Sequence, residues 1–130
     1  MKLKYEDLLG KNFKYNGRGP DEYDCYGLVK ELYSRLGINL PEYASTEARS
    51  LIDLMINKNQ QLFDRIERPT PFCIATFIIR PPYTSHMGVV TENCRQFIHI
   101  YDKASVVVSN LDHPIWSRRI SGFYCYKRGN

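Results

Sequence analysis

Cys25 is the residue of the chain best placed to act as a nucleophile. Asp24 before it is a favoured helix N-cap, and apolar residues follow at helical spacing up to Gly37, a typical helix stop: Leu28, Val29, Leu32, Tyr33 and Leu36. A thiol at the first position of this helix feels the positive end of the helix dipole, which favours the nucleophilic thiolate. The neighbouring acidic residues Asp21, Glu22 and Asp24 oppose that ionisation. A catalytic role for Cys25 therefore requires a histidine partner.

Two histidines lie in consecutive predicted strands. His86 begins one strand segment and His99 lies inside the next. If residues 91–94 form a four-residue hairpin loop that sets Val90 opposite Arg95, the two histidines become direct cross-strand neighbours with Cβ atoms about 5 Å apart. Cys25 would then attack, His86 would take its proton, and His99 would hold the His86 ring. A slip of one residue in the register would separate the two rings.

The elements that must position these residues are two helices followed by a run of strands. A second helix is predicted from Ser45 to Asn57, with an apolar stripe on one side. Short segments rich in β-branched and aromatic residues follow at short intervals: 72–79, 87–90, 97–101, 105–108 and 120–126. This order predicts an α+β domain with a mostly antiparallel sheet.

Length, composition and charge restrict the class of protein. At 130 residues and 15.2 kDa, the chain is expected to form one domain over residues 1–130. With 43% hydrophobic and 25% charged residues, it is neither a disordered tail nor a coiled coil. No apolar run is long enough for a membrane helix or a signal peptide, so we expect no membrane partner and synthesis in the cytoplasm. The net charge of +4 is spread along the chain, which does not favour a nucleic-acid partner.

The remaining cysteines do not indicate a metal site. Cys73, Cys94 and Cys125 form no C-x-x-C pair with each other or with Cys25, and two histidines with one cysteine lack zinc-ligand spacing. We therefore expect free thiols, no metal and no cofactor. Taken singly, a cysteine at a helix start and a histidine in a strand are also compatible with purely structural roles.

Aromatic residues are abundant, at 13% of the chain. Four of them lie close to Cys25 in sequence and are expected to line a substrate groove: Phe13, Tyr15, Tyr23 and Tyr26. Aromatic residues within the predicted strands are expected in the core. The single tryptophan, Trp116, is expected either in the core or in the lining of the groove, with the core favoured.

Five segments, in this order along the chain, resemble the NlpC family of cell-wall cysteine peptidases. Residues 23–29 and 36–41 are similar to the family's nucleophile segment and the Gly-Ile-x-Leu-Pro stretch that follows it. Residues 85–90 resemble the strand with the catalytic histidine, residues 97–100 the strand with the third polar residue, and residues 120–124 the closing strand. The resemblance extends from about Asn12 to Tyr126.

The resemblance implies a papain-like α+β fold, in which the helix carrying Cys25 packs on an antiparallel sheet of about five to six strands. It implies hydrolysis of peptidoglycan stem peptides at the bond between D-γ-glutamate and the diamino acid, with the Cys25 backbone N–H stabilising the oxyanion. In the family, the Asp before the cysteine helps to bind the free amine of the stem, a role that would fall to Asp24. The upstream aromatic position is occupied by Phe13 in place of the usual Tyr, and Tyr15, Tyr23 and Ser85 complete the candidate substrate-binding residues.

One branch of the family, found in bacteriophage tail proteins, resembles this chain most at Phe13 and in the sequence of residues 24–29. In that segment Tyr26 takes the place of the usual Ser. That resemblance implies phage tail proteins as partners and a virion-associated protein or one delivered to the cell wall. Two other functions stay open at this stage. One is a structural or assembly module of a phage tail with little activity, and the other is a papain-like amidase or acyltransferase acting on another substrate.

Overall fold

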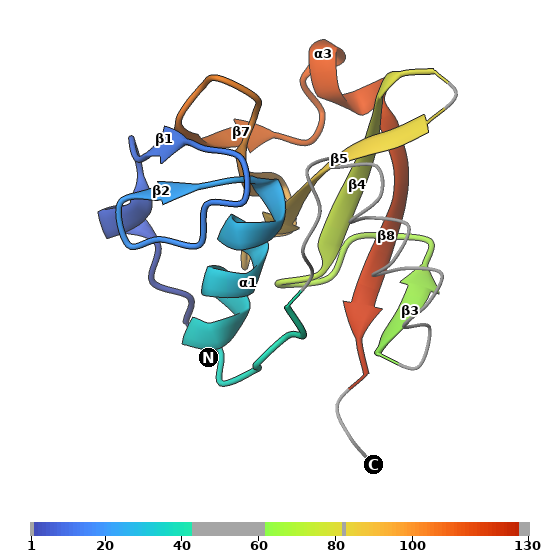
Figure 1. Ribbon diagram of the computed structural model, residues 1–130. Coiled ribbons are helices and arrows are strands. Elements are labelled where there is room, and N and C mark those ends of the chain that lie inside the picture. Colours follow the sequence, from blue (N-terminus) through green and yellow to red (C-terminus); the bar gives the residue numbers. More distant parts are fainter. Residues whose placement is uncertain (1, 43–61, 82, 128–130) are drawn as a thin grey trace.

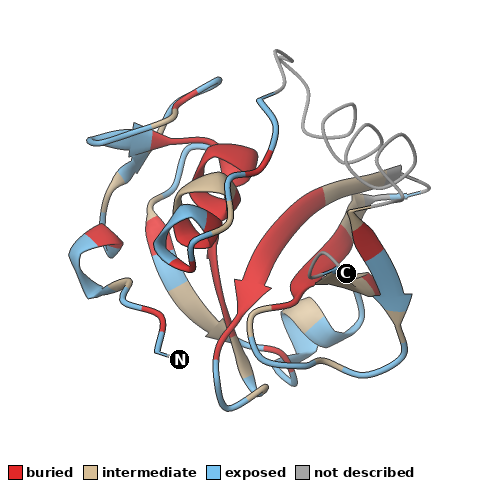
Figure 2. Ribbon diagram, turned by 90° about the horizontal axis from the view of Figure 1, so that it is seen from below, coloured by how far each residue is buried: buried red, intermediate tan, exposed pale blue. Residues whose placement is uncertain are grey.

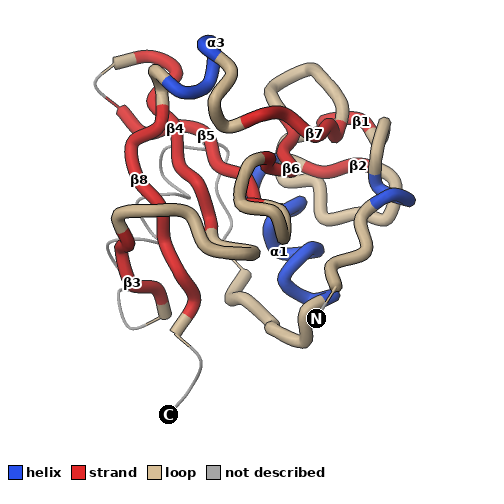
Figure 3. The backbone as a smooth tube through the Cα atoms, turned by 180° about the vertical axis from the view of Figure 1, so that it is seen from behind, coloured by secondary structure: helices blue, strands red, loops and turns tan. Residues whose placement is uncertain are grey.

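The computed structural model describes residues 2–42, 62–81 and 83–127, and it is built around a sheet of six strands (Figure 1). The strand order is β3-β8-β4-β5-β6-β7, and each neighbouring pair is antiparallel. In that order the strands are β3 (Phe63–Ile66), β8 (Ile120–Tyr126), β4 (Ile74–Arg80), β5 (Tyr83–Val90), β6 (Gln96–Ile100) and β7 (Val106–Asn110). Seen from behind, β8, β4 and β5 run side by side (Figure 3). The predicted α+β class with an antiparallel sheet is confirmed.

The long helix α1 (Cys25–Arg35) begins and ends where the sequence predicts. Asp24 has an extended backbone, and its Oδ1 accepts a hydrogen bond of 2.6 Å from the Gly27 N–H, which otherwise would have no helical partner. At the other end, Gly37 adopts φ +82° and its N–H donates to the Ser34 carbonyl oxygen. The helix packs on β5 and β6.

Smaller elements surround this framework. The 3-10 turn η1 (Glu6–Leu8) precedes a parallel pair of two-residue strands, β1 (Asn12–Phe13) and β2 (Glu22–Tyr23). A bridge between Asn12 and Ser105 ties this pair to the segment that enters β7. The short helix α3 (Pro114–Ser117) lies between β7 and β8, capped by the His113 side chain.

Strand alternation divides the buried residues into two clusters, one on each face of the sheet. The first cluster joins α1 to the sheet and includes Met87, Val89, Ile98 and Ile100. The second joins Phe77, Val90 and Phe97 with Trp116 of α3 packed against them. Figure 2 shows buried residues along the helix and the strands it covers, and exposed residues on the outlying loops. None of the described helices is long and apolar enough to cross a membrane.

The observed strands match the predicted segments, and the differences are local. The strands β1, β2 and β3 and the helix α3 were not predicted, because two to four residues give too little periodicity to detect. The predicted helix from Ser45 to Asn57 lies outside the described residues.

The predicted register between β5 and β6 is wrong. Val90 lies opposite Phe97, not Arg95, and Val89 lies opposite Ile98. The connecting turn begins one residue later than expected, because the Thr91 N–H pairs with the Gln96 carbonyl oxygen and the Asn93 side chain accepts from the Arg95 N–H. Moving a loop of constant length by one residue changes the cross-strand pairing by two residues. A shift of two preserves the face on which each side chain points, so the two histidines still share one face.

The loop before α1 is packed tightly against the first turn of the helix. The Gly17 carbonyl oxygen accepts a hydrogen bond from the Asp24 N–H at 3.2 Å. A Cβ added at Gly27 would overlap that same carbonyl oxygen. The glycine at position 27 is therefore required by the close approach of the loop.

We predict that Gly27→Ala destabilises the protein by about 1–3 kcal/mol, as expected for overpacking. The sign is informative, because Gly→Ala inside a helix ordinarily stabilises by about 1 kcal/mol. Chemical denaturation measures the change, and Ser34→Ala on the exposed side of the same helix is the matched control. A Gly27→Ala protein as stable as the control would contradict the packing described here.

Candidate active site

His86 and His99 form a buried, hydrogen-bonded pair. His86 Nε2 lies 2.8 Å from His99 Nδ1, and the two side chains are 2% and 1% exposed. His86 sits on β5 and His99 on β6, so the sheet brings together the two histidines that the sequence pairs. Because of the shifted register, they meet as diagonal neighbours and not as a directly opposed pair.

The pair continues into a third polar group on β7. His99 Nε2 lies 2.7 Å from Ser109 Oγ. If the His99 Nε2–H donates to Ser109, then His99 Nδ1 accepts from the His86 Nε2–H, and His86 Nδ1 keeps a free lone pair. This arrangement of protons leaves His86 able to act as a base. Sequence reasoning missed Ser109, because no motif links it to His99 and only the β6–β7 ladder brings the two together.

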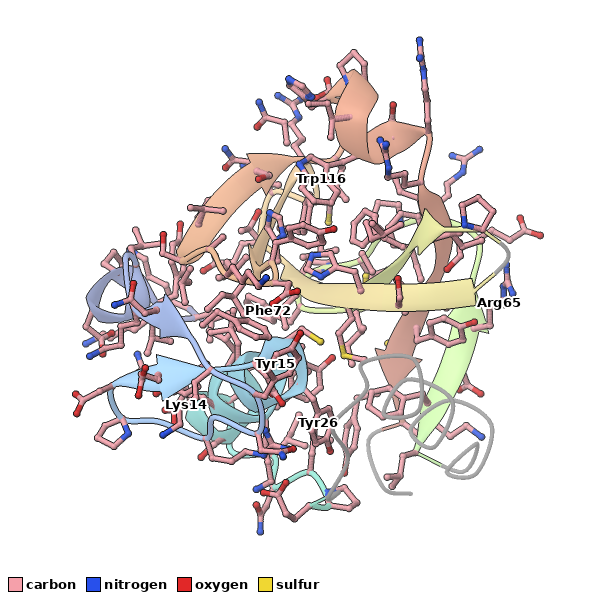
Figure 4. The ribbon with its side chains drawn as sticks, turned by 45° about the horizontal axis from the view of Figure 1, so that its top comes forward. Lys14, Tyr15, Tyr26, Arg65, Phe72 and Trp116 are labelled. Atoms are coloured by element: carbon pink, nitrogen blue, oxygen red, sulfur yellow. The ribbon has the colours of Figure 1, made fainter. Side chains whose placement is uncertain are left out.

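Aromatic rings enclose the histidine pair. The Trp116 indole stacks on the His86 ring at 5.6 Å between centroids and meets the His99 ring edge-on at 4.7 Å. Figure 4 shows Trp116 between α3 and the sheet. Phe77 and Phe97 complete this enclosure. Trp116 packs against the second core cluster, is half-buried, and covers the two imidazoles.

Burial controls the protonation of both rings. It lowers the pKa of His86 to about 3, with a smaller contribution from the charge of His99, and it lowers the pKa of His99 to about 4. Both imidazoles are therefore neutral at neutral pH.

Cys25 is the first residue of α1 and is 5% exposed. Burial raises the pKa of its thiol to about 12, and the Asp24 charge raises it further. The backbone N–H groups of Tyr26 and Cys25 at the helix start, together with Arg18, act in the opposite direction. The sequence anticipated the effects of Asp24 and of the helix start, but not that burial would be the largest cause.

Cys25 and the histidine pair are packed in different clusters. Cys25 belongs to the cluster that joins α1 to the sheet, and the rings around His86 belong to the second cluster. All three side chains are described, and no hydrogen bond links the Cys25 thiol to either imidazole. In this state the site holds a neutral thiol and a neutral imidazole, not a preformed ion pair.

Asp24 is held by three donors. Its Oδ1 accepts from the Gly27 N–H at 2.6 Å and from Arg18 Nη1 at 2.8 Å, and its Oδ2 accepts from the Asn16 N–H at 3.1 Å. The Asp24 carboxylate thus links the loop before the helix to the first turn of α1, next to the candidate nucleophile.

The aromatic residues near Cys25 separate into two groups. Tyr15 is 57% exposed and Phe13 is half-buried, and their rings pack edge-to-face at 5.0 Å. The expectation that Tyr23 and Tyr26 line a groove is wrong, because they are 2% and 0% exposed. Their rings complete the packing of the loop and the helix, which adjacency in sequence did not reveal. Tyr15 and Tyr26 are labelled in Figure 4.

Ser85 is half-buried and lies in a bulge of β5, between the pairs Thr84–Ile78 and His86–Phe77. Bulges often re-aim a side chain next to a site. The substrate-binding roles of Ser85, Phe13 and Tyr15 stay predictions. Within the described ranges, no group of three or more His, Cys, Asp or Glu side chains is arranged to hold a metal ion.

We predict that acidification below pH 6.5 destabilises the fold through the two buried histidines. Their pKa values are lowered in the folded state, so the unfolded chain binds more protons, and stability present above pH 6.5 is lost as the pH falls towards 4. Each histidine contributes at most about 1.4 kcal/mol per pH unit.

Denaturation at pH 7, 6 and 5 measures this slope. His99→Gln should reduce the slope, because it removes one of the two buried imidazoles. Equal slopes for the wild type and His99→Gln would contradict the burial argument.

Comparison with known proteins supports the reading of the fold. Residues 10–124 match the model of the NlpC/P60 family. Over 118 residues, the chain is 23% identical to the Escherichia coli K12 protein named Murein DD-endopeptidase MepS/Murein LD-carboxypeptidase, which covers 89% of this chain and 56% of that protein. Over 43 residues it is 42% identical to the Listeria monocytogenes protein named "Probable endopeptidase p60", covering 29% of this chain and 9% of that one. The chain thus spans about half, or less, of the length of these relatives.

Solved structures show the same fold. A Staphylococcus aureus protein of the NLP/P60 family superposes with a TM-score of 0.67 at 19% identity, covering 94% of this chain and 38% of that one. NlpC2 from Trichomonas vaginalis gives a TM-score of 0.66 at 25% identity, covering 93% and 43%. Together with the family match across most of its length, the sheet and its helix place this chain in the NlpC/P60 family.

Proposed function

We propose that the chain is a cysteine peptidase that hydrolyses peptidoglycan stem peptides, with Cys25 as nucleophile, His86 as base and His99 as the residue that orients His86. The proposed bond is the one between D-γ-glutamate and the diamino acid. Two relatives carry endopeptidase names, one of them for murein, and both belong to longer proteins than this chain. The observation that carries the proposal is the hydrogen-bonded series from His86 through His99 to Ser109.

The chemistry begins with a proton transfer. The Cys25 thiol gives its proton to His86, and the thiolate attacks the carbonyl carbon of the scissile amide. The tetrahedral oxyanion accepts a hydrogen bond from the Cys25 backbone N–H, and the protonated His86 then delivers its proton to the leaving amine. Water attacks the resulting thioester with His86 again as base, which releases the γ-glutamyl carboxylate and restores the thiol.

The proton transfer has to be driven by substrate binding. In the free protein the thiol has a raised pKa of about 12 and His86 a lowered pKa of about 3, so the neutral pair is strongly favoured. A substrate that excludes water and brings the two side chains into contact favours the transfer, since hydrogen bonds in an active site tighten on complex formation. The association with phage tails rests on the resemblance of Phe13 and residues 24–29 and stays a prediction.

We predict that the wild-type chain releases peptides from purified peptidoglycan and that Cys25→Ala abolishes this release. Mass spectrometry of the soluble products identifies the cleaved bond. Cys94→Ala is the matched control, because it removes a thiol in the turn between β5 and β6 and should leave the product profile unchanged. Identical products from wild type and Cys25→Ala would overturn the proposal.

One observation favours a second function, a structural or assembly module with little activity. The thiol of Cys25 is buried, has a raised pKa and makes no hydrogen bond with either imidazole, as expected for a cysteine that only packs. Alkylation kinetics distinguish the two functions.

If Cys25 is the nucleophile, we predict that His86→Ala slows its alkylation at pH 7 by a stem peptide that carries a chloromethyl ketone, at least about tenfold, because a substrate-like reagent brings the thiol to its proton acceptor and the variant lacks that acceptor. Peptide mapping by mass spectrometry gives the rate for Cys25, and Cys94 in the same sample is the internal reference. A Cys25 rate that His86→Ala leaves unchanged, relative to Cys94, would favour the structural module.

A further inference from the structure

Cys73 and Cys125 lie on neighbouring segments of the sheet and have no part in the proposed chemistry. We propose that they form a site of oxidative modification, at which the two thiols exchange with a low-molecular-weight disulfide such as oxidised glutathione and close into a disulfide bond between β4 and β8. Both cysteines are free thiols in the structure. The inference does not depend on the proposed function, because it concerns neither Cys25 nor the histidines.

The sheet places the two cysteines directly opposite each other. β4 and β8 are antiparallel neighbours (Figure 3), and Ile74 lies opposite Tyr124. One further step along this ladder sets Cys73 opposite Cys125. Opposed residues of an antiparallel pair point to the same face of the sheet. A small pocket of about 60 Å³ has both cysteines in its lining, which agrees with this placement.

The backbone hydrogen bonds show which kind of pair the two cysteines form. The Cys73 carbonyl oxygen accepts from the Val90 N–H, so the polar backbone groups of Cys73 point towards β5 and away from β8. Lys127, two residues after Cys125, donates its N–H to the Leu62 carbonyl oxygen, on the side of β3. Residues two apart in a strand direct their backbone groups to the same side, so those of Cys125 also point away from β4. The two cysteines are therefore a non-hydrogen-bonded pair.

A pair of this kind has the dimensions of a disulfide. In a non-hydrogen-bonded antiparallel pair the Cα atoms are about 4.5 Å apart, and the side chains approach each other more closely than in a hydrogen-bonded pair. Disulfide bonds span Cα separations of about 4.4–6.8 Å. The two sulfur atoms can therefore bond after rotation of the side chains, with little movement of the backbone.

The two thiols differ in access, which sets the order of the reaction. Cys125 is half-buried, whereas Cys73 is 1% exposed. Burial also raises the pKa of Cys73 to about 11, so its thiol is a poor first attacker. The Cys125 thiolate attacks one sulfur of the external disulfide and releases the first small thiolate, which leaves a mixed disulfide on Cys125.

The second step closes the pair. The Cys73 thiolate attacks the Cys125 sulfur of the mixed disulfide and releases the second small thiolate. The protons that the two protein thiols lose pass through water to the two small thiolates. In sum, the protein thiols are oxidised to one disulfide, and the external disulfide is reduced to two small thiols.

The other two cysteines are not placed for this reaction. Cys94 packs against the same cluster as Cys73, but it lies in the turn between β5 and β6, where its thiol donates to the Glu92 carbonyl oxygen at 3.8 Å. Cys25 belongs to the cluster that joins α1 to the sheet. Neither of them lies opposite Cys73 in the ladder, so we expect the bond to join Cys73 to Cys125.

The test retains only this pair of thiols. The folded double variant Cys25→Ala/Cys94→Ser is incubated with oxidised glutathione, and the intact protein should lose the mass of two hydrogen atoms, which dithiothreitol should restore. The matched control also carries Cys125→Ser and should show no such loss. A double variant that keeps both thiols, or that stops at a glutathione adduct, would overturn the inference and leave the peptidase function standing.

The wild-type chain supplies a second measurement that does not depend on the folding of any variant. After oxidation and digestion with trypsin in the absence of reductant, residues 66–95 should be joined to residues 120–127. Fragmentation of the joined peptides should place the bond at Cys73. A bond within residues 66–95, from Cys73 to Cys94, would show that the opposed pair is not the site.

The stability of the oxidised protein tests the geometry of the bond. We expect the oxidised double variant to melt about 5–15 °C above its reduced form, because a bond between residues 73 and 125 restricts the unfolded chain. Thermal unfolding followed by circular dichroism measures the difference. An oxidised form that melts at the same temperature or lower would indicate a strained bond and would contradict the pair geometry.

Discussion

The Asp24 carboxylate organises the end of the molecule where the candidate nucleophile lies. It caps α1 through the Gly27 N–H, holds the preceding loop through the Asn16 N–H, and pairs with Arg18. Cys25 follows directly, so the position of its backbone N–H depends on this carboxylate. The same charge raises the pKa of the neighbouring thiol. Asp24 therefore both positions Cys25 and opposes its ionisation, which is why the proposed chemistry requires a base.

The second constraint is the packing of both faces of the sheet. α1 covers one face and Trp116 of α3 covers the other, where the histidines lie. Burial removes water from the imidazoles and keeps them neutral. Three of their four ring nitrogens are paired, two with each other and one with Ser109. A polar network inside an apolar enclosure is stable only when its members are hydrogen-bonded. The hydrogen-bonded series of His86, His99 and Ser109, on β5, β6 and β7, therefore has a well-defined geometry. No hydrogen bond joins this series to the Cys25 thiol.

Much of the fold could be predicted because it follows from local patterns. Asp24, the apolar spacing and Gly37 define α1, and alternating β-branched and aromatic residues define the longer strands. The predicted pairing of β5 with β6 was wrong in register, since the side chain of Asn93 and the backbone of Thr91 decide where the turn begins. The pairing of the histidines survived this error, because a shift of two residues leaves every side chain on its own face.

The sequence by itself determined the class of the fold, the start of α1 at Cys25 and the strand face shared by His86 and His99, because each depends on the chemistry of residues close together in the chain. Only the tertiary structure decided that Ser109 and Trp116 complete the surroundings of the histidines, and that Arg18 binds Asp24. The physical reason is that burial, ring packing and ion pairing depend on which distant segments meet. The spacing of residues in the sequence does not reveal how burial shifts the pKa of the thiol and of the imidazoles. It also does not reveal which donors bind a carboxylate.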